Sequence, residues 1–248
     1  MLDPMPHVSP FDINMAVDAG FDQIFPFSHV LPEQVQGLVQ DAIFSRGPSG
    51  VKKTGIFIGG RDIGVALNML ETAREAMVPP FEVSVLADPS GAFTTAAALV
   101  ACVERQLKRQ HGGVLEGSQA VVFGGTGPVG LATAVIASLA GAHVTIVDPF
   151  NIDVALEKAA EYNARCGANI IGTYASSDAD KARLLAQADL IFCTAKAGVQ
   201  VLSAGVLADA TQLKVAGDVN AVPPLGIEGI KRTHDGEAMV HALSLIHI

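Results

Sequence analysis

A glycine-rich turn is the part of this sequence whose residue types and spacing point most directly to chemistry. Gly125, Gly127 and Gly130 follow the apolar stretch 120–123 and precede a run rich in Ala, Val and Leu. In a strand–turn–helix setting, the first glycine permits a tight turn, the second lets backbone approach a pyrophosphate, and the third lets helix and strand pack closely. The helix N-terminus then attracts the phosphates through its unpaired N–H groups. The predicted dinucleotide site consists of Gly125, Thr126, Gly127, Pro128, Val129 and Gly130.

An acidic residue, Asp148, stands where such a site requires one. It follows the predicted strand 143–147, about 20 residues beyond the turn. A carboxylate at this strand end accepts hydrogen bonds from the ribose hydroxyls of NAD and repels the 2′-phosphate of NADP. We therefore expect NAD as the cofactor, with NADP as the alternative. A helix cap or a surface acid is the structural alternative for Asp148.

The elements around this turn predict an α/β fold made of two α/β domains. In the first part of the chain, the hydrophobic pattern predicts helices at 10–21, 32–44, 62–77 and 93–109, strands at 55–60 and 82–87, and a loop at 47–50. The strand–helix–strand unit between 55 and 87 implies a parallel pair of strands. We place the domain boundary near Gly112, in the polar stretch 110–113.

From residue 119 the alternation restarts and predicts a Rossmann-type parallel sheet. The expected strands are 119–124, 143–147, 169–173, 189–194 and 213–217, and the expected helices are 129–140, 152–166 and 178–187. These strands are apolar on both faces, as strands of a parallel sheet covered by helices are.

Composition excludes several other classes of protein. Half of the 248 residues are hydrophobic and 17% are charged, which favours a compact fold. The net charge of −9 and the scattered Lys and Arg argue against nucleic acid as a partner. Gly, Pro or charged residues interrupt every apolar stretch before the roughly 20 residues that a membrane span needs.

The cysteines and the N-terminus carry no signal for a disulfide framework, a metal site or secretion. Cys102, Cys166 and Cys193 are odd in number and lack CxxC or Cys/His spacing, so we expect buried, reduced thiols and no metal. No basic segment followed by an apolar run opens the chain, and we expect a cytoplasmic protein.

Six segments, in the same order, resemble the bacterial NAD(P)-dependent methylenetetrahydromethanopterin dehydrogenase family. They are residues 9–16, 43–46, 54–60, 87–95, the turn 125–130 and 218–224. The resemblance implies a pterin-substrate-binding domain at 1–112, a Rossmann dinucleotide-binding domain at 113–243, and a homo-oligomer. It implies hydride transfer from the methylene group of methylenetetrahydromethanopterin to NAD(P), which leaves a methenyl cation, in one-carbon (formaldehyde) oxidation.

The same resemblance assigns site residues. It implies catalytic roles for Asp12 and Asp88, whose carboxylates would bind pterin nitrogens and favour the developing cation. A helix N-cap for Asp12 and a turn-forming role for Asp88 are the alternatives. The substrate-binding residues implied are Ser90, Gly91, Thr94, Thr95 and Asn220. The first four stand where a loop enters a helix, so helix capping is their alternative role.

Asn220, Thr194 and Ala195 follow strands at the carboxyl edge of the predicted sheet, where ligands of open α/β sheets bind. We expect Thr194 and Ala195 to line the nicotinamide, with a plain strand-end loop as the alternative. No Ser/His/Asp arrangement, metal-ligand spacing or paired-carboxylate motif is recognisable. This pattern suits hydride transfer, which needs mainly orientation and electrostatics.

Two other functions remain open from the sequence. A methylenetetrahydrofolate dehydrogenase would perform the same transfer on a related pterin, and a non-catalytic NAD-binding module, such as a redox sensor, belongs to a different class. Members of the family continue past Leu243 with a glycine-rich segment that carries a lysine. We therefore expect 244–248 to be a non-native tail of a truncated member. Membership of the family does not by itself imply that this chain is active.

Overall fold

The computed structural model describes residues 1–208, 210–238 and 244–247, and its contacts divide the chain into two compact units, Met1–Phe93 and Thr94–Ile248. The first unit holds a two-stranded parallel sheet of β1 (Gly55–Ile58) and β2 (Ser84–Ala87). Helix α4 (Ile63–Glu75) returns the chain between the two strands, which makes them parallel. The parallel pair predicted from the sequence is confirmed.

Shorter elements complete the first unit. They are α1 (Pro10–Asp18), η1 (Pro32–Gln34), α2 (Val35–Phe44), α3 (Pro48–Val51) and η2 (Pro89–Gly91). Val35, Val39 and Ile43 recur at helical spacing and bury one face of α2 in the core of this unit. The loop expected at 47–50 is wrong, because Pro48 occupies the first position of α3, where its missing N–H costs nothing.

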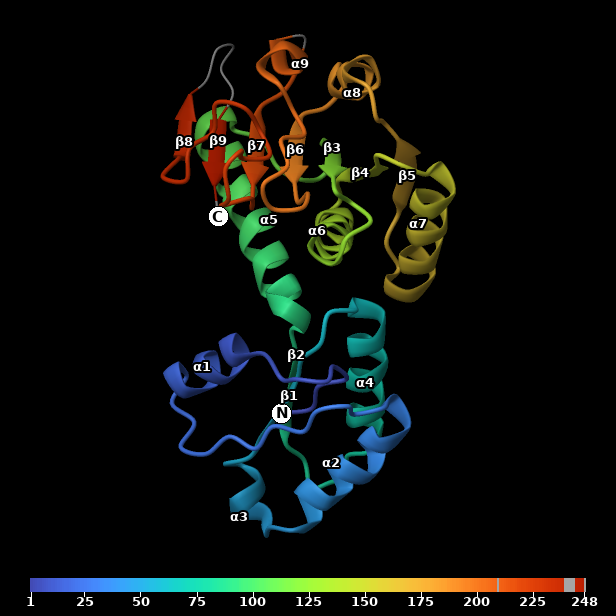
Figure 1. Ribbon diagram of the computed structural model, residues 1–248, viewed down its shortest axis with the longest axis vertical. Helices are drawn as coiled ribbons and strands as arrows, with labels where there is room; N and C mark the ends of the chain where they lie inside the picture. Colours follow the sequence, from blue (N-terminus) through green and yellow to red (C-terminus); the bar gives the residue numbers. More distant parts are fainter. Residues whose placement is uncertain (209, 239–243, 248) are drawn as a thin grey trace. The chain divides into compact units, whose positions relative to one another are not determined.

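The second unit is built on a seven-stranded sheet in the order β5-β4-β3-β6-β7-β9-β8 (Figure 1). Its strands are β3 (Gln119–Phe123), β4 (His143–Asp148), β5 (Ile170–Tyr174), β6 (Leu190–Cys193), β7 (Val215–Asp218), β8 (Asp235–Ala238) and β9 (Ser244–His247). All neighbours from β5 to β9 are parallel, and β8 pairs antiparallel with β9. The order of the first five strands is that of a Rossmann sheet, in which the order reverses between β3 and β6.

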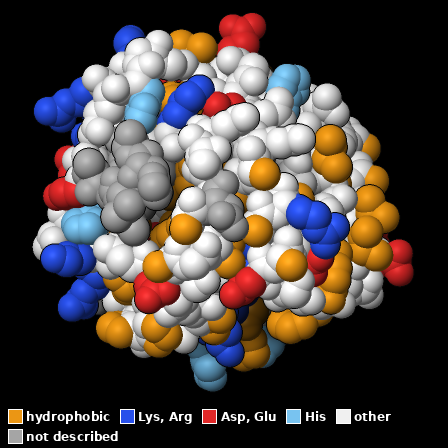
Figure 2. All heavy atoms as spheres, turned by 90° about the horizontal axis from the view of Figure 1, so that it is seen from above, with side chains coloured by type: hydrophobic (Ala, Val, Ile, Leu, Met, Phe, Trp, Pro, Cys, Tyr) orange, Lys and Arg blue, Asp and Glu red, His pale blue; other side chains and the backbone are white. Residues whose placement is uncertain are grey.

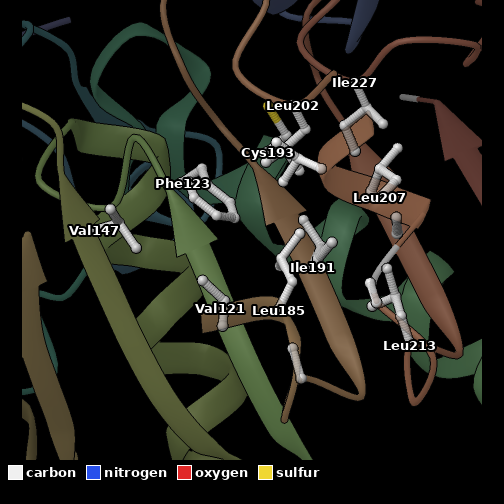
Figure 3. Close-up of a cluster of buried hydrophobic side chains, with 14 of the residues drawn as sticks. Val121, Phe123, Val147, Leu185, Ile191, Cys193, Leu202, Leu207, Leu213 and Ile227 are labelled. Atoms are coloured by element: carbon white, nitrogen blue, oxygen red, sulfur yellow. The ribbon is translucent and has the colours of Figure 1, made fainter. Parts of the chain in front are cut away.

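Helices cover both faces of this sheet. They are α5 (Ala92–His111), α6 (Pro128–Leu139), α7 (Ile152–Cys166), α8 (Asp178–Leu185) and α9 (Ala204–Ala208). On the face of α8 and α9, apolar side chains from β3, β4, β6 and β7 and from both helices form one buried cluster, in which Phe123, Ile191 and Leu185 are almost inaccessible to solvent (Figure 3). The α/β class with a Rossmann-type parallel sheet is thus confirmed.

The sequence-based boundaries differ from the structure at the division between the units and at the ends of several elements. The helix expected at 10–21 ends at Asp18, and the strand expected at 82–87 begins at Ser84. The two units divide at Phe93, whereas the sequence places the boundary after the helix that begins there, near Gly112. The elements α9, β8 and β9 were not predicted. Residues 244–247 form β9, and their suggested non-native origin remains a prediction. The expected domain end at Leu243 lies outside the described residues.

None of the described helices is long and apolar enough to cross a membrane. On the face drawn in Figure 2, Lys and Arg side chains stand apart or in pairs among acidic, apolar and polar ones. The basic residues therefore do not form one continuous patch on this face.

Candidate functional site

The glycine-rich turn joins β3 to α6 at the carboxyl edge of the sheet, and two of its glycines are required by packing. A Cβ atom on Gly125 would lie 2.6 Å from the Cβ atom of Ile146. A Cβ atom on Gly130 would lie 2.3 Å from the carbonyl oxygen of Gly124. Both distances are too short for real contacts. A side chain at Gly125 would push the turn away from β4, and one at Gly130 would push α6 away from the turn.

Gly124 belongs to the same turn but was not predicted from the sequence. Its φ angle of +71° lies in the left-handed region that favours glycine. A Cβ atom there would lie 2.7 Å from the backbone nitrogen of Ala195. The adjacent glycines at 124 and 125 are the signal that could have revealed it.

Gly127 differs from its neighbours, because neither conformation nor packing requires a glycine there. Its φ angle is −80°, and the nearest atom to an added Cβ is the carbonyl oxygen of Gly124 at an ordinary contact distance of 3.4 Å. Gly127 is also the N-cap of α6, and no side chain caps that helix. The open helix N-terminus carries partial positive charge. The turn therefore fits an anion brought against its backbone, with Pro128 and Val129 in the first turn of the helix.

Asp148 is the last residue of β4, beside this turn, and three hydrogen bonds fix the orientation of its carboxylate. One carboxylate oxygen accepts a hydrogen bond from the Thr126 hydroxyl at 2.7 Å, and the other accepts from the backbone N–H groups of Phe150 (2.8 Å) and Asn151 (2.9 Å). Burial raises the pKa of Asp148, but the hydrogen bonds from Asn151, Phe150 and Thr126 outweigh it and lower that pKa below 3.8. Asp148 is neither a surface acid nor the cap of α7, which is Asn151.

Thr194 and Ala195 follow β6 and contact the turn. The Thr194 hydroxyl donates to the carbonyl oxygens of Phe123 (2.9 Å) and Gly124 (3.2 Å). This bond ties the carboxyl ends of β3 and β6 together at the point where the strand order reverses. The expected contacts of Thr194 and Ala195 with nicotinamide stay a prediction.

Asn220 is buried after β7 and joins two loops at the same edge. Its side-chain oxygen accepts from the backbone N–H groups of Gly198 (3.1 Å) and Val222 (3.0 Å), and its amide donates to the carbonyl oxygen of Pro224 (3.1 Å). These bonds position the loops that follow β6 and β7. Direct contact of Asn220 with a substrate stays a prediction.

A buried polar pair beneath these loops was also not predicted. The Asp218 carboxylate accepts from the backbone N–H groups of Asn220 (2.9 Å) and Ile227 (3.1 Å). Burial and then the charge of Asp218 raise the pKa of the Cys193 thiol well above its usual range. A Cβ atom on Gly226 would lie 2.4 Å from the Cys193 sulfur, so this corner is tightly packed. Asp218 stands out in the sequence only as part of a matching segment, and nothing local predicts its burial.

The two predicted catalytic carboxylates lie together in the first unit. Asp12 and Asp88 are only 7% and 8% exposed. Asp12 stands in the first turn of α1 but does not cap it, since the N-cap is Ser9. Asp88 precedes η2, and its carboxylate accepts a hydrogen bond from the backbone N–H of Phe93 at 2.8 Å, in the first turn of α5.

A third carboxylate, Asp3, belongs to this group. Asp3 is 2% exposed. Burial, then the charge of Asp3 and then that of Asp88 raise the pKa of Asp12. Asp3 was not predicted, because a single acidic residue near the start of the chain has no distinguishing pattern. Within the described residues, no group of three or more His, Cys, Asp or Glu side chains is placed to bind a metal ion.

The predicted substrate-binding residues around η2 fall in both units. Ser90 has a φ angle of +53° and donates its hydroxyl to the carbonyl oxygen of Gly60 at 2.9 Å, and Gly91 has a φ angle of +69°. Ser90 borders a pocket of about 240 Å³ in the first unit. Thr94 and Thr95, in the first turn of α5, belong to the second unit. Binding of a ligand by these four residues stays a prediction.

Comparisons with known proteins agree with the resemblance found in the sequence. Residues 10–90 match the family described as methylene-tetrahydromethanopterin dehydrogenase, N-terminal. The NAD(P)-dependent methylenetetrahydromethanopterin dehydrogenase of Methylorubrum extorquens is 44% identical over 230 residues, which cover 93% of this chain and 77% of the relative. The bifunctional protein MdtA of the same organism is 33% identical, over 92% of this chain and 78% of the relative.

Solved structures with a similar fold are more distant. The transhydrogenase from Sinorhizobium meliloti is 17% identical with a TM-score of 0.42, over 85% of this chain and 69% of that chain. The sequence relatives, however, match almost the whole chain at high identity. This chain belongs to the methylenetetrahydromethanopterin dehydrogenase family.

Proposed function

We propose that this chain is an oxidoreductase that transfers a hydride from the methylene group of methylenetetrahydromethanopterin to NAD(P), as one step of one-carbon oxidation. The relative of 44% identity carries this activity in its name. The observation that carries the proposal in this chain is Gly127, a glycine that neither packing nor conformation requires, at the uncapped N-terminus of α6. A ligand phosphate at that point explains why no side chain stands there.

The residues of the turn have distinct proposed roles toward the cofactor. The backbone from Gly125 to Gly130 would hold the pyrophosphate, and the ionised Asp148 would accept a hydrogen bond from a ribose hydroxyl with its remaining lone pairs. A fixed negative charge at that place favours NAD over NADP, whose 2′-phosphate it repels. Bound NAD(P) supplies the hydride acceptor. Thr194 and Ala195 would line the nicotinamide.

Substrate binding is assigned to the first domain, 1–112, and cofactor binding to the second, 113–243. Loss of a hydride leaves positive charge on the pterin, and carboxylates placed beside that charge stabilise it. Asp12 and Asp88 are the buried carboxylates in question. Ser90, Gly91, Thr94 and Thr95 would bind the pterin. Asn220 is also proposed as a substrate-binding residue, and its hydrogen bonds position the loops at the sheet edge. A cytoplasmic homo-oligomer is part of the same proposal, and its size can be measured by light scattering.

The test is the absorbance of reduced nicotinamide after the purified chain is mixed with methylenetetrahydromethanopterin and NAD or NADP. We expect a rise that is faster with NAD. A faster rise with methylenetetrahydrofolate than with the methanopterin substrate would identify the folate enzyme instead. Tight NAD binding to the folded chain without any rise on either pterin would indicate a binding module.

A further inference from the structure

Three carboxylates lie buried together in the first unit, and they differ in their hydrogen bonds. Asp3, Asp12 and Asp88 are 2%, 7% and 8% exposed. Asp3 accepts a hydrogen bond from the backbone N–H of Met5 at 2.7 Å, and Asp88 accepts from that of Phe93 at 2.8 Å. Among the described residues, Asp12 has no such donor. Within the part of the chain that the structure describes, this nearly buried carboxyl group therefore has no hydrogen-bond donor.

The carboxylates of Asp12 and Asp3 face the same small space beside β1. A Cβ atom on Gly59 would lie 2.7 Å from one oxygen of Asp3 and 3.5 Å from one oxygen of Asp12. Because Gly59 has no side chain, the carboxylate oxygen of Asp3 can occupy this space. Two ionised carboxylates that face the same buried space repel each other, and one proton relieves the repulsion.

The surrounding charges determine which carboxylate holds that proton. Asp3 faces Asp12 from the N-terminal segment and Asp88 faces it from the end of β2. His7 and Arg61 border the adjoining pocket together with Asp3, but within the described residues neither Asp3 nor Asp12 forms an ion pair. An N–H donor stabilises negative charge on the oxygen that it contacts. Asp3 and Asp88 each have such a donor, whereas burial, the charge of Asp3 and the charge of Asp88 raise the pKa of Asp12.

We infer that Asp3 is a positioning residue that keeps a proton on Asp12, so that the site meets its ligand with a carboxylic acid rather than with another carboxylate. A protonated Asp12 can donate one hydrogen bond to a neutral pterin. When the bound ligand gains positive charge, the O–H bond of Asp12 breaks, the electron pair stays on its oxygen, and the proton passes to solvent. This step rests on the proposed function, whereas the protonation of Asp12 in the unliganded protein does not.

The first experiment measures that protonation directly. We would label the aspartate carboxyl carbons of the full chain with carbon-13, identify the Asp12 signal by its loss in Asp12→Asn, and titrate it by NMR. The Asp3→Asn variant should lower the titration midpoint of Asp12 by about one pH unit or more, because it removes the nearest like charge. The control Asp41→Asn changes an exposed residue of α2 that is not among the charges acting on Asp12, and should leave the midpoint unchanged. An unchanged midpoint in Asp3→Asn would overturn the inference.

A second variant and a second readout keep the test decisive. If Asp3→Asn does not fold, Asp3→Ser removes the same charge while its hydroxyl can still accept the hydrogen bond from Met5, and it should lower the midpoint in the same direction. An unchanged midpoint in a folded Asp3→Ser would overturn the inference as well. Turnover as a function of pH then tests the proposed function separately. Asp3→Asn should move the acidic limb of the pH profile down by the same amount as the NMR midpoint. A shifted midpoint with an unmoved pH profile would support the inference and refute a catalytic role for Asp12.

Discussion

Replacing each glycine of the turn by alanine separates packing from ligand binding. In Gly127→Ala, the new methyl group lies 3.4 Å from its nearest neighbour in the protein, so the fold accepts it. Alanine is a poorer N-cap than glycine, and the loss of stability should stay below about 1 kcal/mol. The methyl group would, however, occupy the space through which a pyrophosphate approaches the backbone. Losing one hydrogen bond to a charged phosphate costs about 1.5–3 kcal/mol, which weakens NAD binding roughly 10- to 100-fold.

Gly130→Ala should show the opposite pattern. Its methyl group would lie 2.3 Å from the carbonyl oxygen of Gly124, and overpacking of this kind costs about 1–3 kcal/mol, offset by less than about 1 kcal/mol of helix propensity. Gly37→Ala is the matched control, because an added Cβ in α2 meets nothing within 4 Å. It should gain about 0.5–1 kcal/mol of stability and leave NAD binding unchanged.

The assays are urea denaturation for stability and calorimetric titration with NAD for affinity. Wild-type affinity in Gly127→Ala would refute the close approach of a phosphate to that backbone. A loss of stability in Gly127→Ala equal to that in Gly130→Ala would show that packing explains both glycines.

Three further predictions concern Asp148, the cysteines and Ser90. The folded-state pKa of Asp148 is lowered, so its ionised form stabilises the fold above pH 3.8, and this stabilisation is lost as the pH falls through the folded-state pKa. In denaturant melts, Asp148→Asn should be about 1 kcal/mol less stable than wild type at pH 7 and equally stable at about pH 2. The buried Cys193, whose thiol pKa is raised, should react with a disulfide reagent only after unfolding, whereas the half-buried Cys102 and Cys166 should react in the native protein. Peptide mapping identifies the labelled cysteines, and fast labelling of Cys193 in the native protein would contradict this prediction. Ser90 has a positive φ angle, so Ser90→Gly should relieve about 1 kcal/mol of strain and offset the lost hydrogen bond, whereas Ser90→Ala should be measurably less stable in urea.

Most of the sheet could be predicted from the sequence, because its strands are short apolar runs that alternate with amphipathic helices. The strand β6 is buried along its whole length, and such strands read as continuous hydrophobic segments. The strand β8 could not be predicted, because it contains Asp235, Gly236 and Glu237 and is held by long-range contacts. The side chains of Gln106 and Gln110 in α5 donate hydrogen bonds to the backbone of β8, at Asp235 and Gly236. Such contacts leave no local pattern.

In the site, too, the residues that could be predicted are those marked by a local sequence pattern, whereas those that depend on long-range contacts could not be predicted. The turn and Asp148 could be predicted because their spacing along the chain reproduces the geometry of a strand, a turn and a helix. Asp3 could not, since its burial depends on the preceding residue, Leu2, which bridges to Phe27 and to Ile58 in β1. Three segments distant in sequence create that environment.

The predicted site residues fall into two groups: at some positions packing or hydrogen bonds within the protein explain the residue type, and at others they do not. Packing explains Gly130, and hydrogen bonds within the protein occupy the side chains of Thr194 and Asn220. Their side-chain hydrogen bonds are therefore explained without any ligand, and contact of either residue with a ligand stays a prediction. Gly127 and Asp12 are different, because no packing contact requires the glycine and no described hydrogen bond satisfies the carboxyl group. A residue that the folded protein leaves unexplained is the better indicator of a ligand, so substitutions at these two positions should change binding more than stability.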